Sequence, residues 1–245
     1  MNKDVLLFSG GLDSYIAYFY LNKPMCLFID LKHKYADVER DTIQRLQPYM
    51  KNSIVCEEKA LDLGKWEKFD SIIPLRNIYM SMIATNYGDK IWIVGVEGDH
   101  TQDKSPQAFE KISDFLTYFC ERPIKVDSPF WSMTKTEHVA WYVKNGYSIP
   151  ELLKTYSCFS PSGHHCGHCP SCFRRWIAMF NNDIYEKYQS NPLDWDMIPL
   201  YIERMKMGYY SKRRAEEFFT ALFKADYNVG ITNIEWIEKL RHGDK

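Results

Sequence analysis

The fold is decided by the stretch Asp4-Val-Leu-Leu-Phe-Ser-Gly-Gly-Leu-Asp-Ser14 near the amino terminus. Its first five residues form a short apolar run, which is typical of a strand buried inside a parallel sheet. Two glycines then allow a tight turn, and the pattern from Leu12 to Leu21 predicts a helix. A strand, a glycine turn and a helix in this order are typical of an α/β fold.

The same alternation of strands and helices continues to about residue 150. It predicts a doubly wound, Rossmann-like parallel sheet with helices on both faces, in which ligands bind beyond the carboxyl ends of the strands. Further strands are predicted at 25–30, 53–56, 90–96 and 124–126, and helices at 36–50, 77–87, 106–119, 134–145 and 150–155. After about Asp183 the strand patterns cease, and helices are predicted at 199–207, 212–227 and 233–241.

The loop Ser9-Gly10-Gly11-Leu12-Asp13-Ser14 has the composition of a phosphate-binding turn. Its glycines let backbone N–H groups approach an anion closely, and the following helix adds its positive amino-terminal end. Ser9 and Ser14 can donate hydroxyl hydrogen bonds, and Asp13 can hold a Mg²⁺ ion that bridges phosphates. The alternative is a plain glycine turn in which Asp13 caps the helix.

This loop belongs to neither of two common nucleotide-binding motifs. It lacks the Gly-Lys-Ser/Thr of a Walker A loop and the Gly-x-Gly-x-x-Gly of the dinucleotide fingerprint. It resembles the pyrophosphate loop of the PP-loop ATP pyrophosphatases, which have an adenine nucleotide alpha-hydrolase-like fold and cleave ATP between the α- and β-phosphates. The resemblance implies that residues 9–14 bind ATP together with Mg²⁺.

Four of the seven cysteines, Cys158, Cys166, Cys169 and Cys172, fall within fifteen residues. Four thiolates can complete a tetrahedral shell around Zn²⁺, and a closed shell indicates a structural rather than a catalytic ion. Free thiols, an iron–sulfur cluster and a histidine ligand from among His164, His165 and His168 are the alternatives. Nothing else in the sequence asks for electron transfer, so zinc is predicted. The remaining three, Cys26, Cys56 and Cys120, are predicted to be small buried hydrophobic residues.

Charge and hydropathy exclude several classes of partner. A net charge of −1 disfavours nucleic acid as a ligand of the whole domain. No apolar run reaches the roughly 18 residues of a spanning helix, so no membrane partner is expected. The amino terminus lacks the apolar length of a signal peptide, and we expect a cytoplasmic protein.

Segments between the two motifs complete a resemblance to one family, the 7-cyano-7-deazaguanine (preQ0) synthases of queuosine-type biosynthesis. The resemblance covers residues 4–180 or so. Besides the loop and the cysteines, the matching segments are Pro74-Leu-Arg-Asn77, Gly95-Val96, Asp103-Lys-Ser-Pro106 with Phe109, Ser128-Pro129, Thr134-Lys-Thr-Glu137, Thr155-Tyr-Ser-Cys158, Arg175 and Ala178.

The resemblance implies an ATP-dependent ligase that converts 7-carboxy-7-deazaguanine and ammonia to the nitrile. The carboxylate is adenylated, ammonia yields an amide, and a second adenylation allows dehydration. Asp13, Arg76 and Lys135 would then be catalytic, with Arg76 and Lys135 offsetting charge on the phosphates or the carboxylate. Asn77 and Asp103 would recognise the deazaguanine substrate. The alternative for Arg76, Asn77 and Lys135 is an ordinary helix start, and for Asp103 an exposed loop acid.

This chain departs from the family pattern after its second strand. The family usually has Asp-Tyr-Gly-Gln-x-His, whereas residues 30–35 read Asp-Leu-Lys-His-Lys-Tyr. Lys32 therefore stands where the glycine would be, and Tyr35 where the histidine would be. A relative that stops at the amide, 7-amido-7-deazaguanine, is one alternative product.

Three regions are predicted along the chain. Residues 1–150 form a PP-loop nucleotide-binding domain, 151–182 a four-cysteine zinc region, and 183–245 a helical extension that packs on the protein or forms a homodimer. Two further function classes stay open. A tRNA thiolase or amide synthetase would share the loop, although Cys26, Cys56 and Cys120 form no obvious catalytic pair. A zinc-ribbon nucleic-acid binder would share the cysteines.

Overall fold

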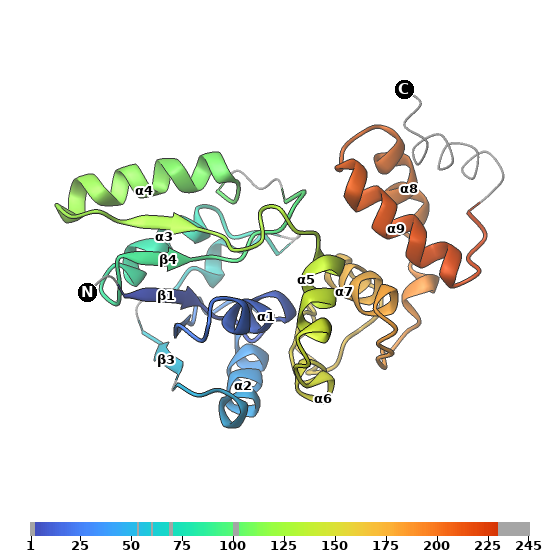
Figure 1. Cartoon of the computed structure of the whole chain (residues 1–245), viewed down its shortest axis with the longest axis horizontal. Coiled ribbons are helices and arrows are strands. Elements are labelled where there is room, and N and C mark those ends of the chain that lie inside the picture. Colours follow the sequence, from blue (N-terminus) through green and yellow to red (C-terminus); the bar gives the residue numbers. More distant parts are fainter. Residues whose placement is uncertain (1–2, 53, 60, 69–70, 100–102, 230–245) are drawn as a thin grey trace.

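The computed structural model describes residues 3–52, 54–59, 61–68, 71–99 and 103–229 of the 245-residue chain. The helix predicted at 233–241 lies outside the described residues. In the described part, a parallel sheet with its helices occupies one end of the molecule and a group of later helices the other (Figure 1). None of the described helices is long and apolar enough to cross a membrane.

Among the described residues, the sheet has five strands in the order β3-β2-β1-β4-β5, and every neighbouring pair is parallel. In register, Leu6 of β1 lies between Cys26 of β2 and Trp92 of β4. The five predicted strands are confirmed, although the fourth ends at Trp92 instead of Val96, which makes only an isolated bridge to Phe130. The strands are β1 (Asp4–Leu7), β2 (Met25–Ile29), β3 (Ile54–Glu57), β4 (Lys90–Trp92) and β5 (Lys125–Asp127).

Helices cover both faces of this sheet, as the doubly wound prediction requires. Because side chains alternate along a strand, Val5 and Leu7 face one core while Leu6 and Phe8 face the other. The first core is closed by α3 (Arg76–Ala84) and α4 (Pro106–Cys120). The second is closed by α1 (Leu12–Tyr20), α2 (Ala36–Leu46), α5 (Lys135–Lys144) and α6 (Ile149–Leu152), so that α4 and α2 lie on opposite sides of the sheet (Figure 1).

Two local predictions are corrected here. The helix expected at 36–50 ends at Leu46 and continues as the 3₁₀ turn η1 (Gln47–Tyr49), because Pro48 cannot continue an α-helix. Cys56 is exposed rather than buried, since β3 is an edge strand with only partial cover. Cys26 is buried as predicted, and Cys120 is half-buried at the end of α4.

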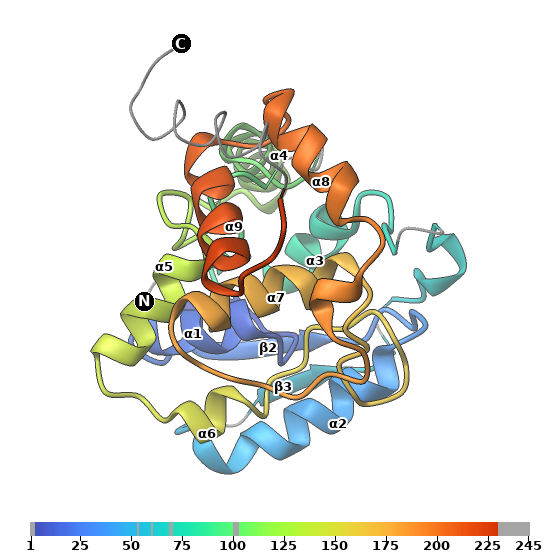
Figure 2. The same ribbon diagram turned by 90° about the vertical axis from the view of Figure 1, so that its right-hand side faces the viewer.

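The later helices form a third core around α7 (Pro170–Asn181), which the sequence analysis did not predict. Pro170 at its first position is a sequence signal of a helix start, but the cysteines around it were interpreted only as metal ligands. Figure 2 looks onto this end and shows α7 below α8 (Ile198–Lys206) and α9 (Lys212–Lys224). The short 3₁₀ turns η2 (Gly64–Trp66) and η3 (Pro192–Asp194) complete the described elements.

The helices predicted at 199–207 and 212–227 are confirmed as α8 and α9, the latter ending at Lys224. Phe173 and Trp176 of α7 pack in one core with Phe218 of α9. On its other side α7 contacts α5. The division at residues 150 and 182 stays a prediction, since α7 packs against helices on both sides of that division.

Candidate functional site

A cavity of about 290 Å³ lies at the carboxyl ends of β1, β2 and β4. Every residue of the phosphate loop except Gly10 lines it, and so do Arg76, Asn77 and Lys135. The Tyr156–Phe159 segment, which leads into the cysteine cluster, forms another wall. The structure therefore brings most of the predicted site residues to one place, and Asp103 does not line this cavity.

The phosphate loop adopts a backbone conformation that requires glycine at position 10. Gly10 has a φ of 72°, and a Cβ there would lie 2.9 Å from Cγ2 of Thr42. Gly11 begins α1 without a side-chain cap, so no side chain of the cap residue covers the positive end of this helix. The hydroxyl of Ser14 donates to the carbonyl of Gly11 at 3.0 Å. Such a helix end is suited to phosphate oxygens.

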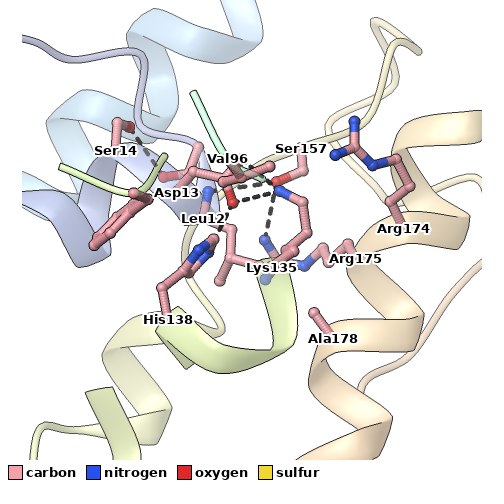
Figure 3. Close-up of polar contacts among 12 residues, drawn as sticks. Leu12, Asp13, Ser14, Val96, Lys135, His138, Ser157, Arg174, Arg175 and Ala178 are labelled. Carbon is pink, nitrogen blue, oxygen red and sulfur yellow. Dashed lines mark hydrogen bonds and ion pairs between the residues drawn. The ribbon is translucent and has the colours of Figure 1, made fainter. Parts of the chain in front are cut away.

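Asp13 is held by two residues of α5 (Figure 3). The ammonium of Lys135 donates to both carboxylate oxygens, and Nε2 of His138 lies 3.0 Å from Oδ1. The His138 ring is fully buried and stacks on Phe130 with 4.7 Å between centroids. The sequence analysis missed His138, although it follows Lys135 by three residues and so lies on the same helix face.

Burial and mutual attraction shift the pKa values of the three residues in this cluster. Burial by itself raises the pKa of Asp13, but the charge of Lys135 and the hydrogen bond from His138 outweigh it and hold that pKa well below its ordinary value. Burial lowers the pKa of Lys135 and of His138, and the attraction of Asp13 offsets only part of this effect. Asp13 is thus an anion at neutral pH, and the side chain of Lys135 beside it also lines the cavity.

A second carboxylate lies near the same wall. Asp99 bonds Lys104 at 2.9 Å and Arg174 at 3.1 Å, and Lys104 lines the cavity. Burial raises the pKa of Asp99, but Lys104 and Arg174 more than compensate and leave it far below its ordinary value. Arg174 was also missed in the sequence analysis, where only the neighbouring Arg175 matched the family pattern. Lys104 and Lys135 therefore both line the cavity, and each is paired with a carboxylate.

Asp103 and Asn77 bind each other. The backbone N–H of Asn77 donates to Oδ2 of Asp103 at 3.0 Å, and its side-chain amide donates to the carbonyl of Asp103 at 3.2 Å. Leu75, the cap residue of α3, has a φ of 58° and no capping side chain. The carboxylate of Asp103 therefore takes the place of an N-cap. It fixes the start of α3, where Arg76 and Asn77 line the cavity.

The four predicted zinc ligands converge on one point. The Sγ atoms of Cys158, Cys166, Cys169 and Cys172 all lie within 4.8 Å of one another. Cys166 and Cys172 are 3.9 Å apart, close to the separation of about 3.8 Å that a tetrahedron of 2.3 Å zinc–sulfur bonds requires. Three of the four are buried, and no histidine belongs to the set. The donors thus fit a closed structural zinc site.

Arg175 joins this cluster to the phosphate loop. Its fully buried guanidinium bonds both oxygens of Glu186 at 2.8 Å and the hydroxyl of Thr155 at 2.7 Å. It also donates to Ser157 at 3.2 Å, and the backbone N–H of Leu12 donates to the same hydroxyl at 3.4 Å. The segment beside the loop is therefore anchored from the α7 side (Figure 3).

Comparison with known proteins finds one matching family model and several similar proteins. A family model described as "Queuosine biosynthesis protein QueC" matches residues 65–183. The 7-cyano-7-deazaguanine synthase of Methanocaldococcus jannaschii is 28% identical over 192 residues, which are 67% of this chain and 78% of that protein. The 7-cyano-7-deazaguanine synthase 1 of Desulfitobacterium hafniense is 28% identical over 206 residues, covering 73% and 91%. The chain is thus similar to 7-cyano-7-deazaguanine synthases over two thirds or more of its length.

A third member of the 7-cyano-7-deazaguanine synthase family has the longest overlap of the three. The protein of Archaeoglobus fulgidus is 27% identical over 233 residues, which are 82% of this chain and 95% of that protein. The family model begins after the phosphate loop and includes Arg76, Lys135 and all four cysteines. The family resemblance inferred from sequence motifs is thus confirmed.

Proposed function

We propose that this protein is a 7-cyano-7-deazaguanine synthase, which converts 7-carboxy-7-deazaguanine and ammonia to the nitrile with ATP. The observation that carries the proposal is the single cavity shared by the phosphate loop, Arg76 and Lys135. One wall suits the polyphosphate of ATP, and cations stand beside it where negative charge builds up. The names of the relatives supply the product, 7-cyano-7-deazaguanine, and the family resemblance implies the acceptor acid.

In the first step, a carboxylate oxygen of the substrate attacks the α-phosphorus of ATP. The bond to the bridging oxygen breaks, and pyrophosphate leaves with the bonding electrons. The loop amides and the hydroxyls of Ser9 and Ser14 would hold this leaving group, and Lys135 would offset its charge. Arg76 would hold the substrate carboxylate against the α-phosphorus, because its side chain lines the same cavity.

In the later steps, ammonia attacks the activated carbonyl carbon, and AMP leaves to give the amide. The amide oxygen then attacks a second ATP in the same way, with loss of another pyrophosphate. Departure of AMP and of two protons from the nitrogen forms the carbon–nitrogen triple bond. The chain would use the same residues in both rounds, since the leaving group and the attacked phosphorus are the same.

Two metal ions fit the residues of the chain. Asp13 suits Mg²⁺ because its carboxylate lines the cavity and keeps 29% of its side-chain surface exposed, although Lys135 has to yield one contact. Magnesium, when bound, supplies positive charge that neutralises the phosphates. The cysteine cluster suits Zn²⁺, whose contribution would be to stabilise the wall that carries Ser157.

The thiolase alternative has little support among the described residues. Burial raises the pKa of Cys26, and that thiol does not line the cavity. Cys158 does line it but belongs to the cysteine cluster. A cytoplasmic location and a homodimer stay predictions.

The proposal is tested by incubating the purified protein with ATP, magnesium, ammonium and 7-carboxy-7-deazaguanine. We expect mass spectrometry to detect AMP together with 7-cyano-7-deazaguanine. A control without the deazaguanine acid should release no AMP above background. Accumulation of 7-amido-7-deazaguanine alone would correct the product to the amide, and the absence of acid-dependent AMP would overturn the proposal.

A further inference from the structure

One corner of the cavity has no part in the mechanism proposed above. The segment that joins β2 to α2 contributes His33 and Tyr35, and the first turns of α2 contribute Glu39. The side chain of His33 is only 6% exposed and that of Glu39 16%. Nε2 of His33 lies 3.4 Å from Oε2 of Glu39, so the imidazole and the carboxylate stand side by side in the cavity wall.

His33 is left unsatisfied in this position. Among the described residues, neither of its ring nitrogens has a hydrogen-bond partner. A buried polar group without a partner costs roughly 1–3 kcal/mol, and native proteins seldom leave one in place unless something else binds it. Because the imidazole borders a cavity, the missing partner is expected to be a polar group of a ligand.

Tyr35 keeps the imidazole in place. Its ring meets His33 edge to face at a centroid distance of 4.1 Å and stacks on Phe159 at 5.9 Å. The imidazole is therefore clamped in one orientation next to Glu39, rather than free to turn toward solvent. The cavity lining also contains apolar side chains that suit a flat ring, namely Leu27, Ile29, Leu31, Met80 and Ile93.

The corner offers a specific order of hydrogen-bonding groups. The two oxygens of Glu39 are acceptors, and an N–H at Nε2 of His33 beside Oε2 is a donor. A guanine-type ring presents the complementary order along one edge, namely the 2-amino group, the N1–H and the O6 oxygen. Replacing N7 by carbon leaves this edge unchanged. Adenine presents only one donor next to an acceptor, so one oxygen of Glu39 would face a lone pair.

We propose that Glu39 and His33 bind the 2-amino, N1–H and O6 edge of the deazaguanine substrate and thereby set its specificity. This inference rests on the proposed function. The 7-carboxyl group belongs to the other ring of the substrate. Binding of the edge in this corner thus leaves the reacting group free to face Arg76 and the phosphate loop, which border the same cavity.

The test compares the wild-type protein with Glu39→Gln, which keeps the shape but turns one acceptor into a donor. We expect kcat/KM for 7-carboxy-7-deazaguanine to fall roughly 10- to 100-fold, because a hydrogen bond to a charged group is lost. KM for ATP should stay within twofold. Asp41→Asn makes the same chemical change at an exposed position of the same helix and should leave both parameters unchanged.

A second substrate distinguishes a loss of contact with the 2-amino group from a general loss of folded enzyme. The analogue 7-carboxy-7-deazahypoxanthine lacks only the 2-amino group. The wild-type protein should use it roughly tenfold less well than the natural acid, whereas Glu39→Gln should discriminate much less between the two. A variant that is merely damaged would lose activity on both acids equally, and a thermal melt would reveal it.

The outcomes distinguish the inference from the proposed function. If the wild-type protein does not turn over the deazaguanine acid at all, the proposed function is wrong. If it does, but Glu39→Gln raises KM for ATP instead, the corner binds adenine and the inference is overturned. Unchanged discrimination against the analogue in Glu39→Gln would overturn it as well.

Discussion

The cysteine cluster and the Asp13–Lys135–His138 cluster each gather side chains around one centre, but they are built in opposite ways. The four cysteines come from fifteen consecutive residues, three are buried, and only Cys158 touches the cavity. Asp13 meets partners that are 122 and 125 residues away, and it keeps 29% of its side-chain surface exposed at the cavity. A closed local cluster suits stability, whereas an open long-range one suits binding and reaction.

The largest expected effect comes from breaking the closed cluster. We expect Cys172→Ser to lose bound zinc and to melt roughly 10–20 °C below the wild type, because thiolate ligation contributes to folding directly. Metal analysis and a thermal melt measure the two changes. Cys56→Ser, at an exposed cysteine outside the cluster, should melt within about 2 °C of the wild type. A fully stable Cys172→Ser protein would show that the cluster has no structural role.

Disrupting the cluster of Asp13, Lys135 and His138 should lower activity far more than stability. We expect Asp13→Asn to lower kcat roughly 10²- to 10³-fold, since a charge next to the phosphate loop is removed. The melting temperature should fall by less than for Cys172→Ser, because His138 and Lys135 keep their packing even though a charge partner is lost. Asp62→Asn, an exposed acid-to-amide control, should match the wild type in both measurements. An Asp13→Asn enzyme with undiminished turnover would contradict the role assigned to Asp13.

The smallest expected effect concerns Asp99, the carboxylate that pairs with Lys104 at the cavity and stabilises the fold. Its pKa is depressed in the folded state, so its contribution is present above about pH 4 and is lost as the pH falls below that value. Asp99→Asn should lower the free energy of unfolding by roughly 1–3 kcal/mol at about pH 7, and the deficit should shrink below about pH 4.

Urea unfolding of both proteins across this pH range measures the change. Asp114→Asn, at an exposed position of α4, should keep the acid dependence of the wild type. A deficit for Asp99→Asn that stays constant with pH would indicate lost packing instead of lost charge pairing.

Local patterns in the chain account well for the sheet and for both motifs. The apolar runs predicted all five strands, and the glycine turn predicted where the cavity would lie, because the carboxyl ends of parallel strands meet at one edge. The helix α7 was not predicted because the cysteines at its start were interpreted only as metal ligands. Cys56 was judged from its apolar neighbours, which do not reveal that β3 lies at the edge of the sheet.

The partners inside the site were much less predictable. Asp103 matched a family segment, but only the fold shows that it caps α3 and binds Asn77. His138 and Arg174 lie next to residues that were singled out, yet nothing nearby in the chain indicates that one meets Asp13 and the other Asp99.

Patterns in the chain were enough to predict the strands, most of the helices, the glycine turn and the cysteine cluster, because each depends on residues that are close together in the chain. Only the tertiary structure shows which residues of α5 contact Asp13, and that His33 and Glu39 share a corner of the cavity with the loop. The reason is physical. Backbone periodicity and ligand spacing are short-range properties, whereas the meeting of distant side chains depends on how helices and connections pack around the sheet.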